Sequence, residues 1–237
     1  MNISIIGDSF CDTVSNYPYP SWPYLLKKYY NADILTSGKC GWALYHAYKL
    51  MIDSIDDTDL IIFCVTDSSR LANRHDIGIT HADIHTESPF SELSTKISNT
   101  NLDKFRLGVK LYYETIGSFE AFDVIHRGLL REIDDVILSK NKRCIFLKCF
   151  KHHSFVDYTF QSGPWGNMAL YEDISKKEFD HMTESQVDNI IGGHGNDNRV
   201  NHLNEQNNYN MYLFLRGVVD NDDFTPREIK MNNYFHS

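Results

Sequence analysis

The sequence predicts an α/β protein, built as a three-layer α/β/α sandwich around a central parallel sheet. Short apolar runs typical of buried strands alternate along the chain with longer segments of helical spacing, and this alternation indicates parallel strands joined by covering helices. The run within residues 59–67 is continuous and apolar, which indicates a strand buried on both faces in the middle of such a sheet. Together these two observations define the fold class.

The first third of the chain supplies two further strands and two helices. Residues 2–7 are predicted as the first strand, because a run rich in β-branched residues stops there at a glycine. Helical spacing predicts a helix over 22–30, with Ser21 as its N-cap. A short strand is expected at 32–36, and a second helix at 42–55. The strand and helix therefore alternate from the start.

After the central strand the pattern weakens. Residues 68–105 are polar and lack periodicity, so we interpret them as an extended insertion in a single domain that spans 1–237. Residues 151–181 are aromatic and irregular, and 187–191 fit either a short strand or a helical turn. We find no internal repeat and no linker.

The second half also contains regular elements. Helical spacing predicts helices over 105–116 and 119–138, followed by a strand at 144–149. A closing helix is predicted over 203–219, capped by Asn204. Six apolar residues are expected on the buried face of the second of these helices: Phe122, Ile125, Leu129, Ile133, Val136 and Ile137.

Composition excludes several functions. The net charge is −9 and the Lys and Arg residues are scattered, which argues against a protein that binds the phosphate backbone of a nucleic acid. No apolar run is long enough to span a membrane, and the first residues lack a signal-peptide pattern, so we expect a cytoplasmic protein that does not bind membranes. The five cysteines form no CxxC pair and are expected to be reduced core thiols.

One serine stands where chemistry is expected. Gly7, Asp8 and Ser9 follow the first predicted strand, and open α/β folds bind ligands at the carboxyl ends of their strands. A serine hydroxyl becomes a nucleophile only when a base takes its proton. His202 lies just before the last predicted helix, where the same edge of the sheet can present it. The pattern therefore indicates a Ser9–His202 pair.

At these residues the sequence resembles the SGNH (GDSL-like) hydrolase superfamily. Gly7-Asp8-Ser9-Phe10 fits the family's first block, and Gly38-Lys39-Cys40-Gly41-Trp42 fits its second. The resemblance implies a flavodoxin-like sandwich with Ser9 as nucleophile and His202 as base. It implies an oxyanion hole from the N–H groups of Ser9 and Gly41, where Gly41 is preferred to Gly38, and an Asp8 that caps or orients the nucleophile turn.

Two positions depart from the family pattern. The third block usually reads Gly-x-Asn-Asp, and this chain has Thr66 and Asp67 at its end. The Thr66 hydroxyl is then the candidate for the third oxyanion contact, with Asp67 in support. The acid expected three residues before His202 is replaced by Arg199, so Asp197 or a backbone carbonyl is left to orient the imidazole.

The resemblance implies an ester hydrolase without a cofactor that acts on a small acyl ester, such as an acylated carbohydrate. The sequence is similar in particular to a divergent group of these hydrolases found in phages and bacteria. A phage-associated location is therefore the alternative to a cytoplasmic one. The rival interpretation is an SGNH scaffold that binds carbohydrate or protein without catalysis. Possible metal ligands stand close together at His75, Asp76, His81, Asp83 and His85, but no known zinc spacing fits them, so we do not predict a metal site.

Overall fold

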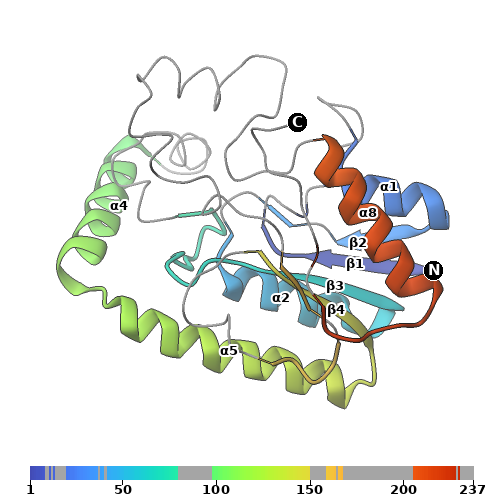
Figure 1. Cartoon of the computed structure of the whole chain (residues 1–237). Helices are drawn as coiled ribbons and strands as arrows, with labels where there is room; N and C mark the ends of the chain where they lie inside the picture. The colour runs from blue at the N-terminus through green and yellow to red at the C-terminus, as the bar shows by residue number, and fades with distance from the viewer. Residues whose placement is uncertain are drawn as a thin grey trace, which may run out of the picture.

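The computed structural model of the chain contains a central sheet with helices on both faces (Figure 1). Its described residues are 1–8, 11, 13, 20–36, 38–39, 42–79, 98–149, 159–163, 165–167, 205–227 and 229. The predicted elements at 187–191 and the cap at Asn204 lie outside these ranges.

The sheet has five parallel strands in the order β2-β1-β3-β4-β5. The strands are β1 (Asn2–Ile6), β2 (Asp33–Thr36), β3 (Leu60–Val65), β4 (Arg143–Lys148) and β5 (Trp165–Asn167). Every residue of β3 is buried, as its apolar run predicts for a strand in the middle of the sheet. The predicted fold class, a parallel α/β/α sandwich, is confirmed.

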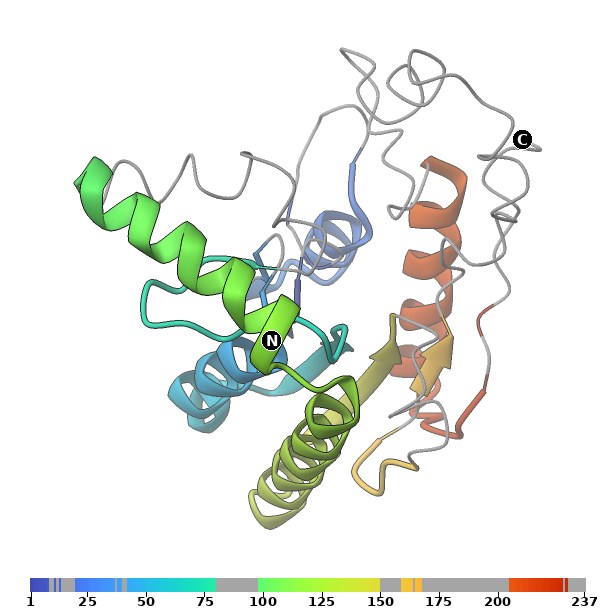
Figure 2. The ribbon, with the colours of Figure 1, turned by 90° about the vertical axis from the view of Figure 1, so that its left-hand side faces the viewer.

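In the described part of the chain, helices cover both faces of the sheet (Figures 1 and 2). Helices α1 (Trp22–Tyr30) and α8 (Glu205–Asp220) pack on the face that carries Leu60, Ile62 and Cys64 of β3. Helices α2 (Leu44–Ser54) and α5 (Phe119–Ser139) pack on the opposite face, which carries Ile61, Phe63 and Val65. The alternation along β3 therefore divides the core into two layers. A short 3-10 turn, η2 (Ile55–Asp57), links α2 to β3.

The segment between β3 and α5 holds a third, smaller apolar cluster. Helix α4 (Asn99–Leu111) and the π-helical turn η4 (Tyr112–Ile116) stand apart from the sheet (Figure 1). Leu102 and Val109 of α4 pack with Ile77 and Ile79 of the loop that follows β3. The helix begins six residues before the predicted start at 105, because its first turn carries no apolar stripe that sequence reasoning can detect.

Two other expectations were wrong. Ile125, predicted on the buried face of α5, is 66% exposed, and the buried positions are His126, Leu130, Ile133, Asp134 and Ile137. Two polar residues occupy the buried stripe because both find partners there: His126 bonds the end of β3, and Asp134 accepts from the N–H groups of residues 161 and 162. Strand β5 lies inside the segment predicted to be irregular and, at three residues, is too short to leave a pattern.

Helices α1 and α8 lie side by side and run parallel. The Oδ1 atom of Asn208, near the start of α8, accepts from the backbone N–H of Trp22 at 2.9 Å. At the other ends, the Tyr30 hydroxyl donates to Oδ1 of Asp220 at 2.8 Å. Because α1 follows β1, its first turn lies at the carboxyl edge of the sheet. The start of α8 is therefore held at that same edge.

We expect Asn208→Ala to lower the free energy of unfolding by about 1 to 2 kcal/mol, because the side chain satisfies a buried N–H group in the first turn of α1. Chemical denaturation measures the change. Asn221→Ala, which removes an exposed side chain after the end of α8, is the control and should change stability by less than about 0.5 kcal/mol. Equal effects of the two substitutions would contradict a stabilising role for the hydrogen bond between Asn208 and the N–H of Trp22.

Candidate functional site

The strand order locates a candidate site at the carboxyl edge between β1 and β3. In a parallel sheet of order 2-1-3-4-5, the chain leaves β1 and β3 in opposite directions, and the crevice between their ends is where ligands bind. Asp8 lies two residues after β1, and Thr66 directly follows β3. Both are completely buried.

A tight turn follows β1. Gly7 has φ of +151°, and a Cβ there would come within 2.7 Å of Cys11 Sγ and of the Cβ and carbonyl oxygen of Cys64. Only glycine fits this position. The carbonyl of Asp8 accepts from the N–H of Cys11 at 3.0 Å, so the residues on either side of positions 9 and 10 are bonded to each other.

A second turn follows β2 and lies against the first. A Cβ on Gly38 would come within 2.5 Å of the carbonyl oxygen of Asp8 and within 2.7 Å of Gly7 C, so the two backbones touch here. The N–H of Trp42 donates to the carbonyl of Lys39 at 3.2 Å, which joins the residues on either side of positions 40 and 41. Gly38 is therefore a packing residue between the two turns.

Arg70, from the loop after β3, contacts both turns. Its Nη1 atom lies 2.5 Å from Oδ2 of Asp8 and donates to the carbonyl of Trp42 at 3.2 Å. The side chain of Arg70 is 6% exposed and that of Asp8 is 0% exposed, so this ion pair is almost entirely out of water. One guanidinium thus connects the segments that follow β1, β2 and β3.

The end of β3 is fixed through its backbone. Nε2 of His126 lies 2.9 Å from the carbonyl oxygen of Thr66, and because a carbonyl only accepts, Nε2 carries the proton. The hydroxyl of Thr66 is completely buried and has no hydrogen-bond partner among the described residues. Asp67 accepts from the N–H of Ser69 at 2.7 Å, an Asx turn that leads the chain toward Arg70.

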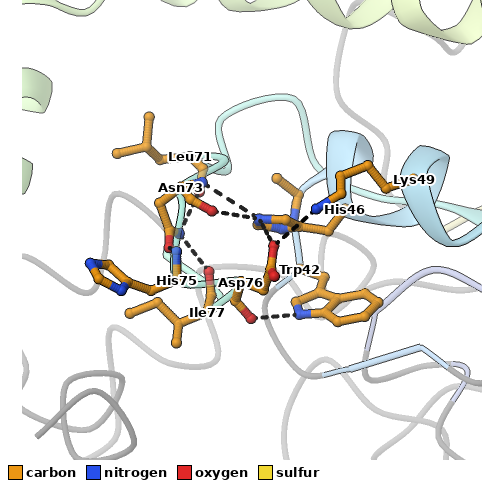
Figure 3. A network of polar contacts seen from close by, with 9 residues as sticks. Trp42, His46, Lys49, Leu71, Asn73, His75, Asp76 and Ile77 are labelled. Atoms are coloured by element: carbon orange, nitrogen blue, oxygen red, sulfur yellow. Dashed lines mark hydrogen bonds and ion pairs between the residues drawn. The ribbon is translucent and has the colours of Figure 1, made fainter. Parts of the chain in front are cut away.

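The loop at 70–79 is braced against α2 (Figure 3). The Trp42 indole donates to the carbonyl of Asp76 at 3.0 Å, and the Asp76 carboxylate lies 3.7 Å from Lys49 Nζ. Nδ1 of His46 accepts from the N–H of Ala43 at 3.2 Å, and its Nε2 faces Asn73 and Asp76. Burial lowers the pKa of His46, although the Asn73 carbonyl and Asp76 act in the opposite direction.

Three thiols lie under the first turn. Cys11, Cys64 and Cys149 are buried in the cluster that contains β1 and α1, and burial raises the pKa of each. Together with Cys144 they form no disulfide among the described residues, in agreement with the prediction of core thiols. Neutral thiols are poor nucleophiles, so we interpret these three cysteines as packing residues beneath the turn after β1.

The structure brings together three of the predicted site residues: Asp8, Thr66 and Asp67 lie at the carboxyl edge. Ser9, Gly41, Asp197 and His202 lie outside the described residues and stay predictions. Among the described residues, no group of three or more His, Cys, Asp or Glu could hold a metal ion. No helix in the described part of the chain is long and apolar enough to cross a membrane.

Sequence reasoning missed Arg70 and His126. Arg70 lies in a polar segment without periodicity, and nothing in the sequence marks it as buried. His126 does carry a signal: it stands four, seven and eleven residues before Leu130, Ile133 and Ile137, on the stripe that faces the sheet. A polar residue on such a stripe indicates a buried hydrogen bond.

No model of a known protein family matches the chain, and neither does any curated protein. The residues at this edge of the sheet therefore carry the evidence for function.

We expect the protein to lose stability as the pH falls below about 6.5, and His46 to account for part of that loss. The pKa of His46 is lowered in the folded state, so in this range His46 takes up a proton more readily in the unfolded chain. Its protonation therefore favours unfolding. His46→Gln keeps an acceptor for the N–H of Ala43 and removes the titration. Urea denaturation from pH 7.5 to 5 should give a shallower pH dependence for the variant, and parallel curves would contradict this.

Proposed function

We propose that the protein is a serine-dependent ester hydrolase of the SGNH type, with Ser9 as nucleophile and His202 as general base. The observation that carries the proposal is the contact between the turn after β1 and the turn after β2. In the sequence, Ser9 falls within the first of these turns and Gly41 within the second. The two turns lie at the sheet edge where parallel α/β proteins bind ligands. Arg70 links the same two turns.

The start of α8 supports His202 as the base. Helix α8 begins at Glu205, three residues after His202, and Asn208 attaches this end of the helix to the start of α1 at the carboxyl edge. We therefore propose His202, which directly precedes this end of α8 in the sequence, as the base. We assign the orientation of its imidazole to Asp197, and a backbone carbonyl is the alternative.

Thr66 supports a third oxyanion contact. A buried hydroxyl without a partner costs about 1 to 3 kcal/mol, and the Thr66 hydroxyl has none among the described residues. A hydroxyl at the end of β3 that donates to a developing oxyanion would make use of this unsatisfied group. The N–H groups of Ser9 and Gly41 supply the other two donors.

The reaction follows from these roles. His202 takes the proton of the Ser9 hydroxyl as its oxygen attacks the ester carbonyl, and the three donors stabilise the negative charge that forms on the carbonyl oxygen. His202 then gives the proton to the leaving alcohol. A water molecule, deprotonated by His202, releases the acyl group from Ser9. The substrate class, a small acyl ester such as an acylated carbohydrate, rests on the family resemblance.

Ser9→Ala and His202→Ala should each reduce the turnover of a short-chain aryl ester by about 10³-fold or more, because nucleophile and base act as a unit. The double variant should be no worse than either single variant. Ser139→Ala, at the exposed end of α5, is the matched control. An inactive wild-type protein that binds carbohydrate would favour the rival function, a non-catalytic binding module, and retained activity in Ser9→Ala would reject Ser9 as nucleophile.

Thr66→Val should reduce turnover by about 10²-fold to 10³-fold, since it removes one oxyanion donor. It should not reduce thermal stability, because the hydroxyl that it removes has no partner among the described residues. Thr66→Ser keeps the hydroxyl and should retain most of the activity. An active Thr66→Val together with an inactive Thr66→Ser would indicate that the methyl group matters and not the hydroxyl.

A further inference from the structure

Arg70 contacts both the turn after β1 and the turn after β2. A single atom, Nη1, reaches the carboxylate of Asp8 in the first turn and the carbonyl of Trp42 in the second. The first contact is an ion pair and the second a charge-assisted hydrogen bond, and both lie in a buried environment, where such interactions are strengthened and exchange with water is limited. Displacement of either turn would leave a buried polar group without this partner.

The loop that carries Arg70 is itself held firmly. The N–H of Leu71 donates to the carbonyl of Ile79 at 2.9 Å, which closes the loop on itself. The hydroxyl of Tyr113, from η4, donates to the carbonyl of Ser69 at 2.7 Å. Arg70 therefore extends from a loop that is fixed on one side by α2 and on the other by the cluster under α4.

We infer that Arg70 is a positioning residue, which holds the Asp8–Cys11 turn and the Lys39–Trp42 turn in the relative placement that hydrolysis requires. This role rests on the proposed function, because the first turn contains Ser9 and the second contains Gly41. Arg70 acts on the reaction through its contacts with Asp8 and Trp42. A misplacement of about 1 Å between reacting groups can cost about 10²-fold in rate.

The test compares Arg70→Met, Arg70→Lys and the double variant Asp8→Asn/Arg70→Met with the wild type. The double variant avoids a buried carboxylate without its cation, so it provides a folded protein if Arg70→Met unfolds. Arg143→Met is the matched control, because Arg143 forms an exposed pair with Asp222 at the opposite edge of the sheet. Amide hydrogen exchange reports on residues 8–11 and 39–42, and kcat and KM are measured on a short-chain aryl ester.

We expect exchange at both turns to rise in Arg70→Met and in the double variant, with exchange in β3 and β4 unchanged. The kcat should fall about 10-fold to 100-fold with little change in KM, and Arg70→Lys should recover part of it because it keeps the charge. Arg143→Met should match the wild type in both measurements.

Two results would overturn the inference. Wild-type exchange at both turns in the Arg70 variants would show that Arg70 does not hold them, and faster exchange with unchanged kcat would show that its contacts with the turns do not serve the reaction. Failure of the proposed function has a different signature: the wild type itself hydrolyses no ester and Ser9→Ala changes nothing. The catalytic role of Arg70 then falls with it, while hydrogen exchange still decides whether Arg70 joins the turns.

Discussion

The carboxyl edge of the sheet depends on the buried ion pair between Asp8 and Arg70. A carboxylate that is completely removed from water is tolerated only when it is paired and hydrogen-bonded. Its partner comes from a loop 62 residues further along the chain, so that loop has to fold back over the ends of β1 and β2. The small apolar cluster of Ile77, Ile79 and α4 gives this loop its own core. The polar segment after β3 is thus part of what allows Asp8 to be buried.

The second constraint is steric. Gly38 allows the backbones after β1 and β2 to touch, and Gly7 allows the turn after β1 to lie against Cys64 of β3, because a Cβ on either would overlap backbone atoms. A larger side chain at position 38 would separate the two turns, and one at position 7 would push the first turn away from β3, so that Nη1 of Arg70 would no longer reach both Asp8 and Trp42. Glycine at positions 7 and 38 and arginine at position 70 therefore act together, although nothing in the sequence spacing connects them.

Sequence periodicity predicted the fold where burial is continuous or one-sided. It located α1 to the residue, and β3 and α5 to within a residue or two at most boundaries, because their apolar residues report directly on the core. It failed at the first turn of α4 and at the buried stripe of α5, where His126 and Asp134 are buried through hydrogen bonds. At the site, the strand-end positions of Asp8 and Thr66 were predictable. The role of Arg70 was not, since long-range ion pairs leave no local pattern.

At Thr66, different groups of the residue are available for structure and for the proposed chemistry. The loop after β3 is held by the backbone of Thr66, through His126, and by Arg70, through Asp8 and Trp42. None of these contacts uses the Thr66 hydroxyl, which can donate one hydrogen bond. In the proposed enzyme that bond is available to the substrate. A threonine can therefore stand at the end of β3 in place of an amide, because neighbouring side chains already fix the loop.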